Sequence, residues 1–165
     1  MNLLLGILIG IVLILALRIL LIRVLLMKFR RDVAVLNTGD FRPLLKSYAE
    51  DAVIVFTDGD HRWTGTHSGK AEIEAFLTEF VRANIQGSIK EVYLGGWVWN
   101  MTMIARFDDQ AFAPGSTEKI YENRTVLVIN TRWGKIIRQE DFYVDTVRMV
   151  AFDKRLTELG ITHVN

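Results

Sequence analysis

The chain has 165 residues, half of them apolar, and its formal net charge of +1 averages two unlike segments. Residues 1–27 contain 22 apolar residues, whereas residues 28–165 are 44% apolar, which is ordinary for a globular domain. Residues 1–31 carry five cations and no anion, and residues 32–165 carry 15 cations and 19 anions. This acidic balance disfavours nucleic-acid binding, and the absence of cysteine excludes disulfides, cysteine-ligated metals and a thiol nucleophile.

The first segment has the length and composition of a transmembrane helix. Residues 3–17 carry no charge, and the apolar run continues past Arg18 to Ile22. About 20 helical residues span the hydrocarbon core, and an Arg side chain near the end of the span reaches the headgroups, so residues 3–22 are expected to contact membrane lipid. Residues 3–17 have no polar face, which disfavours the alternative of a buried helix in a soluble protein.

The charges around this segment indicate how it is used. Only Met1 and Asn2 precede the apolar run, whereas a signal peptide has cations before its apolar core and a small-residue cleavage site after it. We therefore interpret residues 1–27 as an uncleaved single-pass anchor. All five cations of the first 31 residues follow the uncharged run, so the positive-inside rule places residues 28–165 on the cytoplasmic side of the membrane.

Residues 28–165 are long enough for one domain with a substantial core and too short for two. A helix is expected to continue over residues 24–37, with Gly39 just beyond its end. A short helix over residues 41–48 and a β-branched strand over residues 52–57 follow, and residues 58–60 form a turn. Apolar side chains at helical spacing then predict a helix over residues 69–84, namely Ile73, Phe76, Leu77, Phe80 and Val81.

The hydrophobic period changes from helical to alternating after Gly87. Long strands are predicted over residues 88–94, 97–107, 119–130 and 135–146, with turns at 109–117 and 131–134 and a terminal helix over 147–159. Consecutive strands of such a meander pair antiparallel, and the preceding helices cover one face of the sheet. The expected fold class is α+β, a roll of sheet and helices preceded by one transmembrane helix.

Several segments together resemble the SnoaL-like branch of the nuclear transport factor 2-like superfamily, which includes ketosteroid isomerase. The resemblance covers about residues 32–147 and rests on the order and spacing of Leu36-Asn37-Thr38-Gly39-Asp40-Phe41, Leu44, Leu45, Tyr48-Ala49-Glu50-Asp51-Ala52-Val53, Trp63-Thr64-Gly65, Gly69, Tyr121-Glu122-Asn123-Arg124, Trp133-Gly134-Lys135-Ile136 and Phe142-Tyr143-Val144-Asp145-Thr146. It implies a cone-shaped roll, in which a curved, mixed but mainly antiparallel sheet surrounds a pocket, three helices cover it, and the domain is commonly dimeric. It implies no single reaction, because members include isomerases, cyclases, dehydratases, hydrolases and many proteins without activity.

The last predicted strand carries the first candidate catalytic groups. Asp141, Tyr143 and Asp145 fall on one face because side chains alternate along a strand. In the resembled family a Tyr-x-Asp at this position lines the pocket, which implies that role for Tyr143 and Asp145. A carboxylate in an apolar pocket has a raised pKa and can act as a base in proton transfer. The alternative is that Arg or backbone donors satisfy these carboxylates, or that they face water.

A second constellation consists of Arg106 and Asp108, which share one face of an earlier strand. Together with Asp141 they resemble the Asp-Arg-Asp arrangement of limonene-epoxide hydrolases, in which one Asp activates water, Arg orients both carboxylates and the other Asp protonates the epoxide oxygen. The sequence departs from that pattern at Phe56-Thr57-Asp58, where Tyr-x-Asn is expected, and at Glu140, where Trp is expected. The alternative is an ordinary Arg–Asp cross-strand pair near the turn at Asp108-Asp109.

Neither a metal nor a cofactor is expected. His61 and His67 are six residues apart, with no third ligand at a metal-binding spacing. The segment from Gly65 to Ala71 lacks the spacing and the final Ser or Thr of a phosphate-binding loop. The candidate pocket-lining residues are Phe56, Trp63, Phe80, Trp97, Trp99 and Arg124. For the aromatic rings, a place in the core or in a dimer interface is the alternative.

The sequence leaves two classes of function open. The first is a membrane-tethered domain that binds a small lipophilic ligand or a protein partner without catalysis, as a homodimer or as a subunit of a membrane complex. The second is a pocket enzyme of the ketosteroid isomerase, polyketide cyclase or epoxide hydrolase type, in which carboxylates act as acid and base. The departures from both catalytic patterns favour the first. Whether Asp108, Asp141 and Asp145 meet in one closed cavity discriminates between the two.

Overall fold

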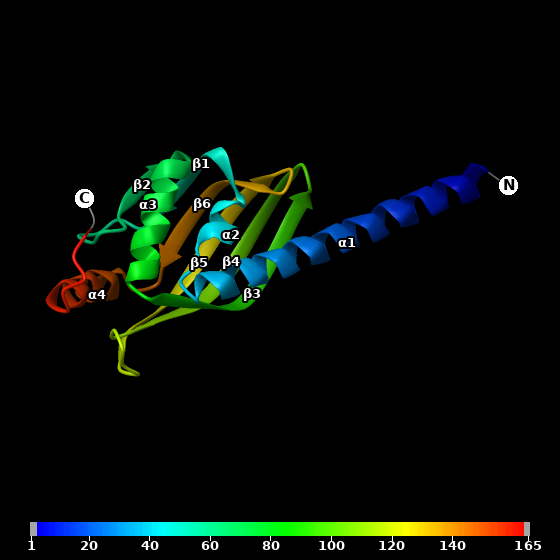
Figure 1. The fold of residues 1–165 in the computed structure, drawn as a ribbon. Coiled ribbons are helices and arrows are strands. Elements are labelled where there is room, and N and C mark those ends of the chain that lie inside the picture. Colours follow the sequence, from blue (N-terminus) through cyan, green and yellow to red (C-terminus); the bar gives the residue numbers. More distant parts are fainter. Residues whose placement is uncertain (1–2, 164–165) are drawn as a thin grey trace.

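The computed structural model describes residues 3–163, and within them the chain forms four helices and a six-stranded sheet (Figure 1). Along the chain the elements are α1 (Leu3–Leu36), α2 (Arg42–Leu45), β1 (Tyr48–Phe56), β2 (Gly65–Ser68), α3 (Gly69–Arg82), β3 (Ile85–Trp97), β4 (Asn100–Phe112), β5 (Lys119–Arg132), β6 (Lys135–Tyr143) and α4 (Thr146–Glu158). The predicted α+β class with one long apolar helix at the amino terminus is confirmed.

The sheet has the strand order β2-β1-β6-β5-β4-β3. Strands β3 to β6 form the predicted meander, in which each strand pairs antiparallel with the next. Strand β1 pairs parallel with β6, and the short β2 pairs antiparallel with β1 at one edge. The expected mixed but mainly antiparallel sheet is therefore confirmed, with the parallel pair joining the first strand of the domain to the last.

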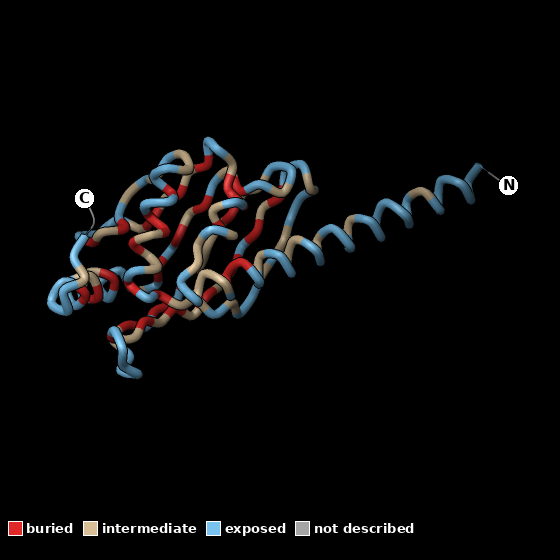
Figure 2. Tube along the Cα trace, in the orientation of Figure 1, coloured by how far each residue is buried: buried red, intermediate tan, exposed pale blue. Residues whose placement is uncertain are grey.

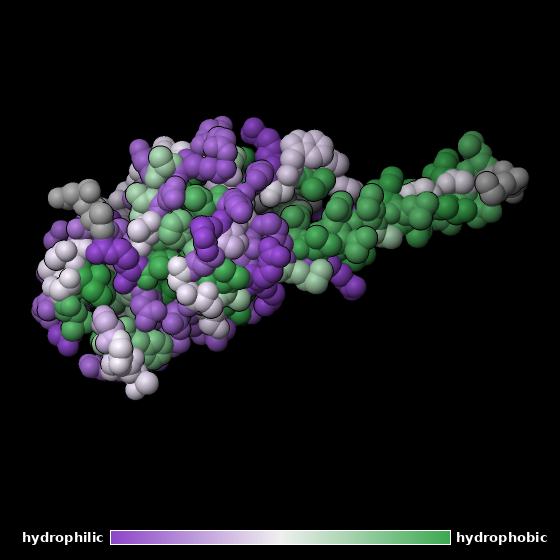
Figure 3. Space-filling model, viewed as in Figure 1, coloured by the Kyte–Doolittle hydropathy of each residue, from purple (hydrophilic) through white to green (hydrophobic). Residues whose placement is uncertain are grey.

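Helix α1 is continuous from the apolar segment into the domain. Its first part projects away from the sheet and is exposed almost throughout (Figure 2). Its length and composition are those of a helix that can cross a membrane, and its projecting surface is hydrophobic on the face shown in Figure 3. Its last turns lie against the domain, where Val33 and Asp32 are buried. Residues 1 and 2 of the expected anchor at 1–27 lie outside the described residues, and no break separates residues 3–27 from residues 28–36.

The carboxylate of Asp32 is held where α1 meets the domain. Its side chain is about 2% exposed and forms ion pairs with Lys28 and Arg31 on its own helix. The hydroxyl of Ser47 donates a hydrogen bond of 3.1 Å to Asp32 Oδ2. A buried carboxylate without partners is strongly destabilising, so these donors make the position tolerable and fix α1 to the start of β1.

Several element boundaries differ from the sequence-based expectation. Helix α2 ends at Leu45 rather than Tyr48, and β1 begins at Tyr48 rather than Ala52. Strand β4 runs on to Phe112 through residues predicted as a turn, because it pairs with β3 on one side and β5 on the other along this stretch. Strand β6 ends at Tyr143 rather than at Thr146, because the Asn123 side chain bonds both the carbonyl (2.7 Å) and the N–H (3.3 Å) of Asp145. Strand β2 was expected as part of a loop.

The two turns that end the meander hairpins lie on the side toward which α1 projects (Figure 1). Val98 and Trp99 connect β3 to β4, and Trp133 and Gly134 connect β5 to β6. Trp133 and Gly134 have φ values of 51° and 76°, which a two-residue hairpin turn of type I′ requires. Glycine adopts such a φ without strain, which explains the Trp-Gly pair within the predicted turn at 131–134.

Candidate functional site

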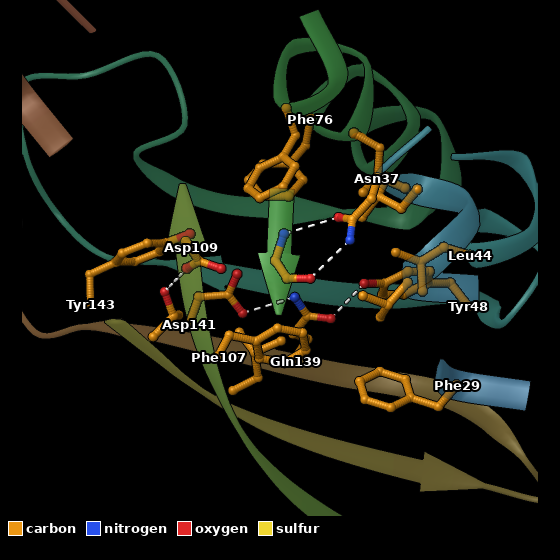
Figure 4. A pocket seen from close by; sticks show the side chains of 17 residues that line it. Phe29, Asn37, Leu44, Tyr48, Phe76, Phe107, Asp109, Gln139, Asp141 and Tyr143 are labelled. Atoms are coloured by element: carbon orange, nitrogen blue, oxygen red, sulfur yellow. Dashed lines mark hydrogen bonds between the residues drawn. The ribbon is translucent and has the colours of Figure 1, made fainter. Parts of the chain in front are cut away.

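A cavity of about 70 Å³ lies between the inner face of the sheet, the last turns of α1, and helices α2 and α3. This volume admits a few water molecules or a small ligand group. Its lining combines an apolar wall with a polar end (Figure 4). The lining residues are Phe29, Val33, Leu36, Asn37, Leu44, Tyr48, Phe76, Leu77, Phe80, Gly87, Phe107, Asp109, Thr125, Leu127, Gln139, Asp141 and Tyr143.

The apolar wall follows from helical spacing in α1 and α3. Phe29, Val33 and Leu36 recur at intervals of four and three residues, so they lie on one side of α1 and face the sheet. Phe76 and Phe80 recur at the same spacing in α3 and face the cavity from the other side. The helix that carries the predicted anchor therefore also supplies one wall of the cavity.

The polar end is built by three neighbouring strands, each of which points alternate side chains inward. Asp109 comes from β4, Thr125 from β5, and Gln139, Asp141 and Tyr143 from β6. Figure 4 shows both carboxylates at the same end of the cavity, near Tyr143. Six side chains with polar atoms, when Tyr48 is included, therefore converge on one small space.

A chain of hydrogen bonds orders these groups. The hydroxyl of Tyr48 donates to Gln139 Oε1 (2.6 Å), and Gln139 Nε2 donates to Asp141 Oδ1 (2.8 Å). The hydroxyl of Thr125 donates to Asp109 Oδ2. The amide of Gln139 is thereby oriented with its oxygen toward Tyr48, which leaves its nitrogen for the carboxylate.

Burial raises the pKa of both carboxyls toward neutrality. The pKa of Asp141 rises to about 7, mainly because burial disfavours the charged form, with a smaller effect of the nearby Asp109 charge; the hydrogen bond from Gln139 opposes the rise. Burial likewise raises the pKa of Asp109 to about 6, against the hydrogen bond from Thr125. Burial also raises the pKa of Tyr143 well above its ordinary value, so its hydroxyl stays protonated. The cavity thus holds two carboxyls that change charge near neutral pH beside a permanent O–H donor.

Gly87 makes room for one of these carboxylates. It lies opposite Asp109 in the pairing of β3 with β4, and a Cβ there would stand 3.2 Å from Asp109 Oδ1 and 3.0 Å from a ring carbon of Phe107. The Asn37 side chain accepts a hydrogen bond from the N–H of Gly87 (3.0 Å) and donates one to its carbonyl (2.9 Å). The end of α1 is therefore tied to the strand that borders the carboxylate.

The structure brings two of the five candidate catalytic residues into the cavity, Asp141 and Tyr143. Asp145 was expected on the same strand face, but β6 has already ended, and Asp145 caps α4 instead. Its Oδ1 accepts from the Arg148 N–H (3.0 Å), and its carboxylate pairs with the Arg148 guanidinium at 3.1 Å. The carboxylate of Asp145 is therefore paired with an Arg and a backbone donor, which is the alternative to a catalytic role that the sequence left open.

Arg106 and Asp108 lie on the outer face of β4, because Phe107 and Asp109 take the inner one. Arg106 pairs with Glu91 at 3.0 Å, and Asp108 pairs with Lys90 at 3.4 Å. Both side chains are more than a third exposed. The arrangement resembling epoxide hydrolases is therefore not assembled, since Asp141 lies on the other side of the sheet.

Among the expected pocket-lining residues, Phe80 lines the cavity. Phe56 packs behind the cavity lining. Its ring centroid lies 5.0 Å from that of Tyr143 and 5.4 Å from that of Phe76. Trp63 is fully buried in a separate part of the core, where it stacks on Phe152 at 5.8 Å. Phe56 therefore supports the cavity lining from the core, whereas Trp63 packs away from the cavity.

The other three expected pocket-lining residues lie elsewhere. Arg124 borders an outer surface hollow that also includes Asp108 and Asp145. Trp97 and Trp99 lie at the turn of the β3–β4 hairpin and away from the cavity. The turn falls at residues 98–99, whereas the sequence predicted it before residue 97. His61 is buried beside Phe56, and no group of three potential ligands among residues 3–163 is placed to hold a metal ion.

Sequence reasoning missed Asp109, Gln139, Thr125 and Tyr48. Asp109 was assigned to the predicted turn over residues 109–117. The available signal was the alternation of Ala105, Phe107, Asp109 and Ala111, which continues past the expected end of the strand. The same alternation could have identified Gln139, which lies two residues before the candidate Asp141 and therefore on the same face of β6.

Comparison with known proteins identifies this architecture. A nuclear transport factor 2-like protein of unknown function from Burkholderia pseudomallei superposes with a TM-score of 0.65 over 78% of this chain and 96% of that chain, at 19% identity. The chain has the nuclear transport factor 2-like fold. A protein of this fold from Anabaena variabilis matches with a TM-score of 0.60 over 75% of this chain and 89% of its own, at 23% identity.

A further match is TerC, co-crystallised with polyporic acid. It aligns with a TM-score of 0.64 over 79% of this chain and 98% of its own length, at 19% identity. No protein-family model and no curated protein sequence matches the chain. The resemblance stated from the sequence is confirmed at the level of the nuclear transport factor 2-like fold.

The raised pKa of Asp141 makes the stability of the domain pH-dependent. The folded chain retains a proton on Asp141 up to about pH 7, while the unfolded chain loses it near pH 4, so this group's contribution to stability falls as the pH rises between those values. We expect Asp141→Asn to gain stability relative to the wild type between about pH 4 and about pH 8, by at most about 4 kcal/mol. Chemical unfolding at several pH values measures this difference.

The matched control is Asp108→Asn, which removes a carboxylate from a half-exposed position on the outer face of the same sheet. We expect its effect on stability to change with pH by much less than that of Asp141→Asn. A difference between Asp141→Asn and the wild type that stayed constant across this range would contradict the assignment of Asp141 as a buried group titrating near neutrality.

Proposed function

We propose that this chain is a membrane-anchored domain that binds a small lipophilic ligand in the cavity between α1, α3 and the sheet. The observation that carries the proposal is an apolar cavity with two protonatable carboxyls at one end and the anchor helix itself as one wall. Ligand pockets are largely apolar with a few polar groups that fix orientation, which is the arrangement found here. A ligand with an apolar body and one hydroxyl or carbonyl group matches both parts of the lining.

A second cavity supports a ligand with an apolar body. It measures about 60 Å³, shares Phe29 and Leu44 with the first cavity, and continues along α1. Leu25, Met101 and Met103 supply much of its apolar lining. The two cavities are therefore neighbours, and a ligand too large for the first would reach the second only if the Phe29 side chain moved aside. TerC, which has the same fold, was co-crystallised with polyporic acid.

A fluorescent phenol provides a test of binding, because it combines an apolar ring system with one hydroxyl. We expect 2-naphthol to bind the full-length chain in detergent micelles, with Asp141→Asn raising the Kd about tenfold through loss of a charge-assisted hydrogen bond. Val33→Phe, which fills the cavity from α1, is expected to abolish binding. Fluorescence titration against empty micelles measures the Kd.

The control for this titration is Asp108→Asn, which leaves the cavity lining unchanged. It should retain the wild-type Kd. Equal affinities for the wild type, Asp141→Asn and Val33→Phe would refute binding in this cavity.

The carboxyl pair also favours a second candidate function, acid–base catalysis of proton transfer next to a carbonyl group. In this reaction Asp141 removes a proton from carbon, the Tyr143 hydroxyl donates a hydrogen bond to the oxygen that becomes an enolate, and the proton returns to a different carbon. A base whose pKa is about 7 suits this role, because it is partly ionised at neutral pH and still basic enough to accept the proton.

Isomerisation of cyclohex-3-enone to the conjugated enone tests this candidate. If Asp141 is the base, we expect the rate to rise as the pH passes about 7 and to fall by at least about a hundredfold in Asp141→Asn, while Asp108→Asn retains the wild-type rate. Absorbance of the conjugated product follows the reaction. A wild-type rate equal to that of the buffer would leave ligand binding as the function and eliminate catalysis on this type of ketone.

We further propose that the domain lies on the cytoplasmic side of the membrane. The cations from Arg18 to Arg31 follow the uncharged part of α1, which supports this orientation. The chain has no cysteine, so a single introduced cysteine reports its own side of the membrane. Two positions suit this purpose: Ser116, in the exposed loop between β4 and β5, and Asn2, which precedes the apolar run in the sequence.

In intact cells we expect a membrane-impermeant maleimide to label Asn2→Cys and to leave Ser116→Cys unlabelled until the cells are lysed. The expected contrast follows from the opposite sides on which the two positions lie. The mass shift of the purified chain measures labelling. Labelling of Ser116→Cys in intact cells would reverse the proposed orientation.

A further inference from the structure

Three tryptophans gather at the turns of the two meander hairpins. Trp97 and Trp99 stack with ring centroids 5.2 Å apart and an interplanar angle of 5°, and Trp133 lies 6.2 Å from Trp99. The three side chains, which we call the tryptophan cluster, are 38%, 49% and 70% exposed in that order. Three large rings in mutual contact at a surface, rather than in the core, need an environment that accepts them.

Helix α1 passes directly beside this cluster. The Arg18 guanidinium lies 5.2 Å from the centre of the Trp97 ring, and its Nη2 donates a hydrogen bond of 3.3 Å to the Gly96 carbonyl. An apolar groove between the helix and the hairpin is lined by Ile14, Leu17, Arg18, Leu21, Ile22, Gly96, Trp97, Val98, Trp99 and Met101. The cluster therefore lies level with residues 14–22 of the helix.

The length of the helix sets the height of the cluster relative to a bilayer. At a rise of about 1.5 Å per residue, Leu3 to Ile22 extends about 30 Å, which is the thickness of the hydrocarbon core. If this segment spans the core, Arg18 lies within about one turn of its boundary. The last turns of α1 are packed on the sheet, so the domain cannot move away from the bilayer without bending the helix.

We propose that the tryptophan cluster is seated at the boundary between the hydrocarbon core and the headgroups of the leaflet from which α1 emerges. This inference rests on the proposed membrane anchoring and adds a second contact between the domain and the bilayer. Tryptophan favours this region because its ring is apolar and its indole N–H can meet carbonyl and phosphate oxygens. Arg18 fits the same depth, where its guanidinium can pair with a lipid phosphate.

Phospholipid accounts for the surface better than a second protein. The cluster continues the exposed apolar surface of the helix that enters the membrane, and a cation accompanies it rather than the mixed charges of a protein interface. Its position at the boundary of the hydrocarbon core leaves lipid as the neighbour that is present wherever the anchor is inserted. The consequence is a fixed orientation, in which the two hairpin turns point into the membrane surface.

Tryptophan fluorescence tests this seating with the full-length chain. The chain has four tryptophans, and the fourth, Trp63, is fully buried in the core. The wild type is reconstituted in phosphatidylcholine and phosphatidylglycerol vesicles with or without a lipid carrying a doxyl quencher near the headgroup. The comparison variant replaces Trp97, Trp99 and Trp133 by Phe and retains Trp63.

We expect the shallow quencher to reduce wild-type emission about twofold or more and to leave the emission of the triple Phe variant almost unchanged. A quencher at the end of the acyl chain should act more weakly on the wild type, because the cluster lies near the boundary. The wild type alone keeps the test decisive if the variant fails to fold, since Trp63 is shielded and any quenching must come from the cluster.

Alkaline carbonate extraction of the same vesicles separates this proposal from the anchor on which it rests. A chain that resists extraction but shows no quenching overturns the seating and leaves the anchor intact. A chain that carbonate releases overturns both. An emission shift that depends on the protein-to-lipid ratio, without quenching, assigns the cluster to a second copy of the chain and also overturns the proposal.

Discussion

The structure depends on a single helix that must satisfy two environments. Over residues 3–17, α1 is apolar on every side, which only a membrane or another apolar partner accommodates. From Phe29 onward it is apolar on one side only, and that side is buried against the sheet. Because the helix does not break between the two parts, the position of the domain relative to any membrane is determined by the packing of its last turns.

This packing also determines what the cavity can be. Phe29, Val33 and Leu36 of α1 close a space that the sheet and α3 would otherwise leave open. The bonds between Asn37 and Gly87 then fix the helix end beside Asp109. Removing the helix would expose two carboxyls whose pKa values depend on burial, so the acid–base properties of the site are a consequence of the same contact that positions the domain.

The buried carboxyls are the places where the chain departs from what stability alone favours. Asp141 receives one hydrogen bond from Gln139, and Asp109 receives one from Thr125, yet no cation among the described residues pairs with either. By contrast, the buried Asp32 and Glu79 have Lys or Arg partners. Buried groups that are incompletely compensated concentrate at functional sites, which is why this cavity is the candidate site.

The sequence predicted most of the architecture because periodicity reports burial directly. The meander strands, α3 and the terminal helix were predicted within a few residues, and the mixed sheet followed from the resemblance. The site was predicted less completely, because a shift of one residue along a strand moves a side chain to the other face. Asp108 was chosen because it shares a strand face with Arg106, whereas Asp109, which faces the cavity, was assigned to the predicted turn. The turn between β3 and β4 was expected before Trp97 but lies at residues 98–99, so Trp97 and Trp99 lie at the hairpin end and not in the cavity.

The three apolar spaces along α1 form one series between the proposed membrane surface and the carboxyls. Met101 lines both the groove beside the tryptophan cluster and the second cavity, and Phe29 lines both the second cavity and the first. A ligand dissolved in the bilayer would therefore meet apolar side chains along the whole helix before it reached Asp141. A water-soluble ligand gains nothing from such a lining. The arrangement of the helix thus favours a lipophilic ligand independently of the chemistry at the polar end of the cavity.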